Sequence, residues 1–137
     1  MEKIVGKSGG ALHIVHDTSI SCETLSEYFE EHCATCAIIG RTAHAIITEK
    51  DIVRLIANPK AAHPSMVKVN EIATKRPVCV SSTATPSEVL SIMHSARFRH
   101  VPQQNVLTGE IEDVVDIVTI AKKPDFASLP VYQVIQG

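Results

Sequence analysis

Aromatic residues are scarce in this chain of 137 residues. It has two tyrosines, three phenylalanines and no tryptophan, although 45% of its residues are hydrophobic. A buried core must therefore consist mostly of Ile, Val, Leu and Ala, and the chain is long enough to bury one.

Long apolar runs and an excess of positive charge are also missing. No stretch approaches the ~20 consecutive apolar residues of a membrane-spanning helix, and residues 1–10 lack the apolar segment of a secretory signal. The 13 Lys and Arg are outnumbered by 15 Asp and Glu, whereas binding to a phosphate backbone requires a basic face. We therefore expect a cytoplasmic protein that binds neither membrane nor nucleic acid, and whose four cysteines are buried free thiols.

The chain contains an internal repeat at an offset of 64 residues. Residues 14–21 and 78–85 each read as a short strand followed by polar turn residues and a helix N-cap. Ser21 is expected to cap the first of these helices. Thr85 is expected to cap the second, where Glu88 completes a capping box.

A second pair of matching segments, residues 45–48 and 113–116, lies at an offset of 68. The change of offset predicts four extra residues in the second copy, which we assign to a hairpin loop within residues 103–109. Each copy then reads strand, helix, strand, strand, helix. Thr48 is the predicted N-cap of the first copy's last helix, and residues 60–68 read as a linker between the copies.

These segments resemble a known family. Residues 69–80, 85–89 and 99–102 resemble the second half of a tandem cystathionine-β-synthase (CBS) domain pair, and residues 45–51 are similar to its signature of two apolar residues followed by Thr-x-x-Asp. The resemblance implies an α/β (α+β) fold. It consists of two tandem βαββα units of the CBS type, whose three-stranded sheets pack together with pseudo-twofold symmetry.

The resemblance also divides the chain. Residues 1–62 correspond to a first CBS-like unit with an N-terminal lead-in, and residues 63–123 correspond to a second unit. Residues 124–137 form a tail in which a partly alternating segment could add a strand or pack on a partner.

A regulatory function follows from the same resemblance. Such modules bind adenine nucleotides (AMP, ADP or ATP) or S-adenosyl ligands in the clefts between their units. They are non-catalytic, require no cofactor, pair into homodimers, and regulate an attached enzyme or transporter. The ligand is expected to favour one orientation of the two units or of the dimer.

The resemblance assigns the ligand-binding residues one by one. Asp51, at the third position of its helix, would accept hydrogen bonds from the ribose diol, and the Thr48 hydroxyl would bind ribose or phosphate oxygens. Arg99 and His100 match the family's phosphate-facing pair. The adenine would be read by backbone groups and an apolar wall, formed by Arg76, Pro77, Val78 and Ile46.

The second copy departs from the family pattern. Asp116 and Thr119 stand where the family has a hydroxyl residue and then Asp, so the two groups are exchanged and Asp116 would repel a phosphate. Residues 35–37 of the first copy correspond to residues 99–101 of the second, but they contain no basic pair. We therefore expect one competent site and, at Asp116 and Thr119, a weaker second one.

Other interpretations remain open. Thr48 and Asp51 could form a capping box alone, and the module could be a ligand-free dimerisation scaffold. Cys33 and Cys36 form a C-x-x-C that could serve a thiol or metal sensor, but it falls at the end of a helix and lacks a second ligand pair. Because this pair of cysteines lacks further ligands, we expect no metal site. We also expect no enzyme, because the sequence has no G-x-S-x-G and no Gly-rich phosphate loop.

Overall fold

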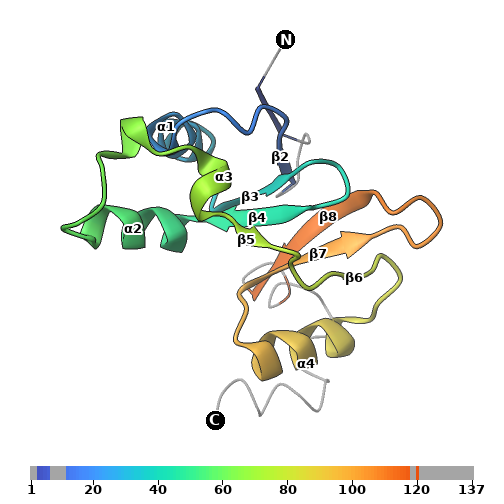
Figure 1. Cartoon of the computed structure of the whole chain (residues 1–137). Helices are drawn as coiled ribbons and strands as arrows, with labels where there is room; N and C mark the ends of the chain where they lie inside the picture. Colours follow the sequence, from blue (N-terminus) through green and yellow to red (C-terminus); the bar gives the residue numbers. More distant parts are fainter. Residues whose placement is uncertain (1–2, 7–11, 118–119, 121–137) are drawn as a thin grey trace. The chain divides into compact units, whose positions relative to one another are not determined.

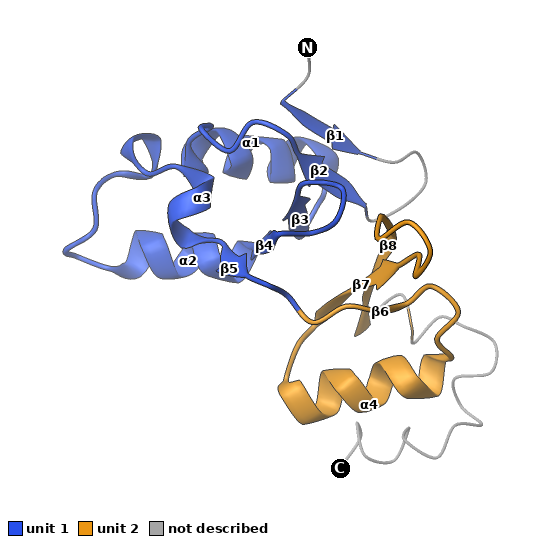
Figure 2. Ribbon diagram, turned by 45° about the vertical axis from the view of Figure 1, so that its right-hand side comes forward, with its two compact units in different colours: residues 1–77 blue, residues 78–137 orange. Residues whose placement is uncertain are grey.

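The structure, a computed structural model, describes residues 3–6, 12–117 and 120 (Figure 1). It divides into two compact units, unit 1 at residues 1–77 and unit 2 at residues 78–137 (Figure 2). None of the described helices combines the length and the apolar character needed to cross a membrane.

Unit 1 is built on a five-stranded sheet in which the strands follow one another in chain order. Neighbouring strands are antiparallel except for β2 and β3, which are parallel because the first helix connects them. The strands are β1 (Ile4–Gly6), β2 (His13–Val15), β3 (Cys36–Ile39), β4 (Ala45–Thr48) and β5 (Thr74–Lys75).

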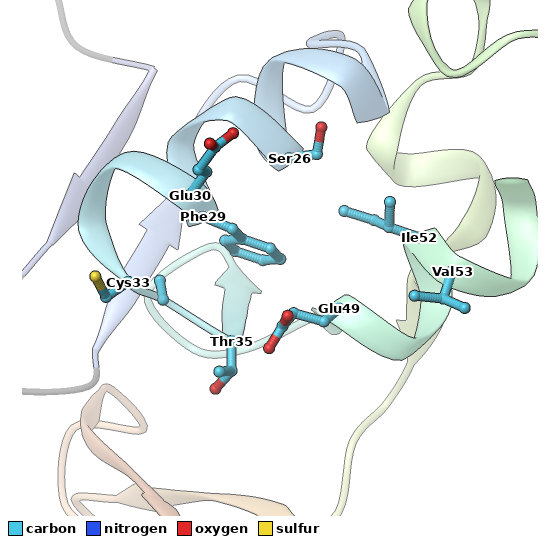
Figure 3. A pocket seen from close by; sticks show the side chains of 9 residues that line it. Ser26, Phe29, Glu30, Cys33, Thr35, Glu49, Ile52 and Val53 are labelled. Atoms are coloured by element: carbon cyan, nitrogen blue, oxygen red, sulfur yellow. The ribbon is translucent and has the colours of Figure 1, made fainter.

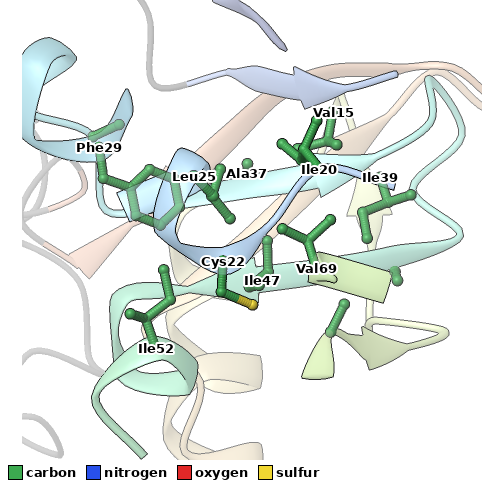
Figure 4. Close-up of a cluster of buried hydrophobic side chains, with 13 residues drawn as sticks. Val15, Ile20, Cys22, Leu25, Phe29, Ala37, Ile39, Ile47, Ile52 and Val69 are labelled. Carbon is green, nitrogen blue, oxygen red and sulfur yellow. The ribbon is translucent and has the colours of Figure 1, made fainter. Parts of the chain in front are cut away.

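Helices cover one face of this sheet because alternate strand residues supply an apolar surface there. Their core brings Val15, Ile39 and Ile47 from the strands against Leu25 of the first helix and Ile52 of the second (Figure 4). The helical elements of unit 1 are α1 (Cys22–His32), α2 (Glu49–Ala57), the 3-10 helix η1 (Pro64–Met66) and α3 (Val69–Ile72).

Unit 2 has a smaller sheet in the order β6-β7-β8 and a core of its own. Leu90 and Val101 are fully buried in that core. The elements are β6 (Val80–Ser81), α4 (Pro86–Ala96), β7 (His100–Gln104) and β8 (Ile111–Asp116).

The N-caps predicted for the repeat are confirmed. The Ser21 hydroxyl accepts a hydrogen bond from the backbone N–H of Thr24 at 3.0 Å. At the corresponding positions of α4, the Thr85 hydroxyl accepts from the N–H of Glu88 at 3.2 Å, and the Glu88 carboxylate accepts from the N–H of Thr85. Both helices therefore begin with a hydroxyl N-cap, 64 residues apart, and α4 adds the reciprocal bond of a capping box.

Both helices also end in the same way. Cys33 and Arg97, again 64 residues apart, take left-handed backbone conformations with φ of 52° and 59°. In each case the next N–H bonds back to the last turn, from Ala34 to the carbonyl of Phe29 at 2.9 Å in α1. This similarity was not contained in the sequence prediction.

The four extra residues of the second copy lie in the β7–β8 hairpin. Ile39 pairs with Ala45 in the first copy, and Gln103 pairs with Asp113 in the second. Five residues separate the first pair and nine separate the second. The predicted position of the insertion is therefore confirmed.

The first sheet is wider than predicted, and the predicted linker is structured. Strands β1 and β5 extend the expected three strands to five. The segment 60–68 contains η1 and packs on α1, because the Cys22 N–H donates to the Val67 carbonyl at 2.8 Å. Val69 then donates to the Ile20 carbonyl at 3.0 Å. Residues 63–77 thus belong to unit 1, although the family resemblance groups them with the second unit.

Strand β6 is shorter than the repeat predicts. The expected strand begins at Val78, but Val78 is 43% exposed and β6 covers only Val80–Ser81. At the other end of unit 2, β8 runs to Asp116. Thr119 and the predicted tail at residues 124–137 lie outside the described residues.

Candidate functional site

The junction of β4 and α2 holds two of the predicted ligand residues together. The Asp51 carboxylate accepts a hydrogen bond from the backbone N–H of Thr48 at 2.9 Å, and a second from the Thr48 hydroxyl at 3.3 Å. Thr48 is extended and Asp51 occupies the third helical position, so the predicted capping geometry is confirmed.

This arrangement leaves acceptor capacity on Asp51. Both hydrogen bonds end on Oδ2, and no group of the described residues donates to Oδ1. The side chains of Thr48 and Asp51 are partly exposed. Because Glu49 adds a second carboxylate to the first turn of α2, this helix end suits a neutral hydroxyl donor better than an anion.

Ile46 lies on the same strand as Thr48, two residues before it, so the two side chains share one face of the sheet. Ile46 is buried and pairs with Thr74 of β5. Arg76 follows β5 with a φ of 51°, and its N–H donates to the His44 carbonyl at 3.0 Å. Arg76 and Pro77 thus directly follow β5, the strand that pairs with β4.

The remaining predicted residues belong to unit 2. Arg99 is exposed, and His100 begins β7 directly opposite Asp116 at the end of β8. The N–H of Ile117 donates to the Arg99 carbonyl at 3.2 Å. Val78 lies before β6 in the same unit. The assignment of Val78, Arg99 and His100 to a ligand stays a prediction.

The strand pairing confirms how the two copies correspond. Thr48 pairs with Cys36 in unit 1, just as Asp116 pairs with His100 in unit 2. The N–H of Glu49 donates to the Thr35 carbonyl at 3.0 Å, which repeats the bond between Ile117 and Arg99. The two units therefore have different side chains at equivalent backbone positions. Unit 1 has a hydroxyl opposite a thiol, and unit 2 has a carboxylate opposite an imidazole.

A cavity of about 420 Å³ lies between α1 and α2 (Figure 3), and the sequence analysis did not find it. Its position depends on how two helices distant in sequence pack together, which no local motif encodes. None of the predicted ligand residues lines it. The lining residues are Ser26, Phe29, Glu30, Cys33, Ala34, Thr35, Glu49, Ile52 and Val53.

The cysteines differ in exposure. Cys22 and Cys36 are buried, as expected for apolar thiols, but Cys33 is exposed, because it is the C-cap of α1. Burial, with a smaller contribution from the Glu71 carboxylate, raises the pKa of Cys22 to about 11, and burial also raises the pKa of Cys79. The described residues contain no group of three or more His, Cys, Asp or Glu side chains that could hold a metal ion.

Part of the chain is similar in sequence to CBS-domain proteins. A family model described as "CBS domain" matches residues 69–102. CBS domain-containing protein CBSCBSPB2 of Arabidopsis thaliana is 33% identical over 64 residues, which are 47% of this chain and 12% of that protein. The uncharacterized protein YlbB of Bacillus subtilis is 37% identical over 73 residues, covering 51% of this chain and 47% of that protein. The chain spans less than half the length of either relative.

Solved structures share the fold over most of the chain. CBS domain protein PAE2072 from Pyrobaculum aerophilum, complexed with AMP, has a TM-score of 0.73 at 18% identity and covers 84% of this chain and 87% of its own. The CBS domain pair of protein MJ0100, in complex with 5′-methylthioadenosine and S-adenosyl-L-methionine, has a TM-score of 0.68 at 19% identity and covers 80% and 87%. Residues 69–102 therefore match the model of the CBS domain, and the chain has the fold of a CBS-domain pair.

Proposed function

We propose that this protein is a regulatory, non-catalytic module that binds an adenine nucleotide or an S-adenosyl ligand. The proposal rests chiefly on the pairing of Thr48 with Asp51 at the start of α2. It is supported by the fold, because some solved structures that share it contain such ligands. AMP, 5′-methylthioadenosine and S-adenosylmethionine all contain an adenosine ribose. A carboxylate with an acceptor oxygen available suits the vicinal hydroxyls of that ribose.

Asp51 binds the ribose through Oδ1 while Oδ2 continues to cap the helix. The Thr48 hydroxyl donates to Asp51 and can still accept from a ligand hydroxyl. Ile46 supplies an apolar wall for the adenine, and the backbone of residues 76–78 reads its edge. Hydrogen bonds to a charged acceptor are each worth about 1.5–3 kcal/mol, so Asp51 contributes a large part of the affinity.

Arg99 and His100 bind the phosphate, when the ligand has one. Arg99 is an exposed guanidinium, which can donate two parallel hydrogen bonds to a phosphate. The matching position in unit 1 has Thr35 and Cys36 instead, and Asp116 places a negative charge where unit 1 has Thr48. We therefore expect one ligand per chain.

The ligand acts as a signal and needs no cofactor. It shifts the population of the module toward the conformation that binds it more tightly, and a partner enzyme or transporter responds to that shift. The size of the response is limited by the difference in ligand affinity between the two conformations.

The module also forms a homodimer in this proposal. Val53 and Ile56, one turn apart on α2, are 62% and 65% exposed, which is unusual for side chains of this size on a helix that packs on a core. Their burial against a second copy would remove this apolar surface from water.

Isothermal titration with AMP, ADP, ATP and S-adenosylmethionine tests the proposed ligand class. We expect saturable binding of at least one of them with a stoichiometry near one per chain. If none of the four binds at millimolar concentration while the protein sediments as a dimer, the ligand-free scaffold is the correct interpretation.

A further inference from the structure

Among the described residues, His13 in β2 is the one polar residue that is buried, with 8% of its surface exposed. Its Nδ1 lies 2.7 Å from the hydroxyl oxygen of Tyr28 on α1. The two rings meet edge to face, with centroids 5.3 Å apart. An imidazole is thus enclosed between the sheet and the first helix and hydrogen-bonded to a phenol.

A second histidine adjoins these two rings and completes a cluster of three. The His32 ring stacks on the Tyr28 ring at a centroid distance of 4.0 Å, and lies 6.3 Å from the His13 ring. Its Nδ1 is 3.1 Å from the Tyr28 carbonyl oxygen, so the position of the ring is fixed. Both histidine rings therefore contact the same tyrosine ring and lie near each other.

Strand β1 lies directly against the bond between His13 and Tyr28. Gly6 of β1 pairs with His13 across the ladder, and a Cβ at Gly6 would be 2.7 Å from His13 Nδ1 and 2.9 Å from the Tyr28 hydroxyl. Only glycine allows the backbone to come so close. The His16 N–H donates to the Lys3 carbonyl at 2.8 Å, beside the β1–β2 ladder.

The ionisable groups near His13 come from the elements that pack against it. On α1, Tyr28 and His32 face it, while Glu27 and Glu31 are exposed to solvent. The described strand β1 brings no ionisable side chain. In β3, the Cys36 side chain lies on the other face of the sheet from Ala37 and Ile39, which belong to the core under the helices.

We propose that the cluster of His13, Tyr28 and His32 is a pH-sensitive latch, which keeps β1 packed on the sheet when His13 is neutral and loosens it when His13 is protonated. A proton on His13 would bury a charge, place it near a second histidine, and change which partner donates in the bond to Tyr28.

The sign of the pH effect follows from the direction of the shift. Burial, assisted by His32, lowers the pKa of His13 below its usual 6.5. An opened state, in which His13 is exposed, binds protons more readily, so opening becomes easier as the pH falls below about 6.5. Above that pH the contribution of the latch is complete.

Amide hydrogen exchange at His16 measures the opening of β1, because the partner of that N–H is the Lys3 carbonyl. Between pH 7.5 and 5.5 we expect the protection factor of the His16 amide to fall several-fold. The fall is limited to about tenfold, because pH 5.5 lies one unit below the ordinary histidine pKa of about 6.5 and one proton is bound on opening. The Val69 amide, bonded to Ile20 in the same unit, should keep its protection factor.

His13→Gln removes the titration and retains a polar side chain, so its His16 protection factor should not change over this pH range. An unchanged protection factor in the native protein, or an equal fall in His13→Gln, would overturn the proposal. Should that variant not fold, NMR titration of His13 in the native protein decides the question. A His13 pKa at or above 6.5 would also overturn it.

Discussion

Asp51 accepts two hydrogen bonds from Thr48, and both end on the same carboxylate oxygen, Oδ2. The sequence left open whether these two residues cap a helix or bind a ligand. With Oδ2 engaged in the cap and Oδ1 without a donor among the described residues, one carboxylate can do both. Capping would then fix the orientation of Oδ1 before a ligand arrives.

Each unit has its own core, which gives the first prediction. Leu25 of α1 and Leu90 of α4 are both fully buried, so replacing either with Ala should lower the free energy of unfolding by about 2–5 kcal/mol. Leu107→Ala is the matched control. Its side chain is 92% exposed at the tip of the β7–β8 hairpin, and its removal should change stability by less than about 0.5 kcal/mol. Urea unfolding of the three variants measures these differences.

The second prediction concerns thiol reactivity. Cys33 is exposed and borders the cavity between α1 and α2, whereas Cys22 and Cys36 are buried. Native protein at pH 8 should therefore react quickly with a maleimide at Cys33 and much more slowly at Cys22, whose pKa of about 11 keeps it protonated. Cys33→Ser should remove the fast phase. Fast labelling that persists in this variant would place the reactive thiol elsewhere.

Assembly provides the third prediction. If α2 forms the dimer contact, Val53→Ser combined with Ile56→Ser should lower the mass measured by sedimentation equilibrium from dimer to monomer. Leu107→Ser removes an even more exposed apolar side chain from another element and should leave the mass unchanged. A dimer that survives in the α2 variant would assign the contact to a different surface.

The first residues of α1, α2 and α4 could be predicted because N-caps depend on local chemistry. Ser21, Thr85 and Thr48 each follow an extended segment and precede an acidic residue in the first helical turn, and the structure confirms all three as caps. The insertion in the second copy was predicted for a similar reason. Apolar strand pairs fix the register on either side of it, so only the hairpin can absorb extra length.

Other features depend on contacts that a sequence does not display. Strands β1 and β5 have three and two residues, too few for a periodic pattern, and exist because neighbouring strands offer them hydrogen bonds. Cys33 is exposed because it is the left-handed C-cap of α1. The cavity between α1 and α2 and the cluster of rings around His13 arise only when distant elements pack.

The account depends most on Asp51 as the ribose-binding group, and the second capping box offers a control for it. Glu88 occupies the same helical position behind Thr85, so Asp51→Asn and Glu88→Gln both replace a capping carboxylate with an amide. Isothermal titration of each variant with the nucleotide that binds the native protein should show a loss of affinity of roughly 10- to 150-fold for Asp51→Asn, which corresponds to 1.5–3 kcal/mol. Glu88→Gln should keep the native affinity. Native affinity in both variants would contradict the proposed site.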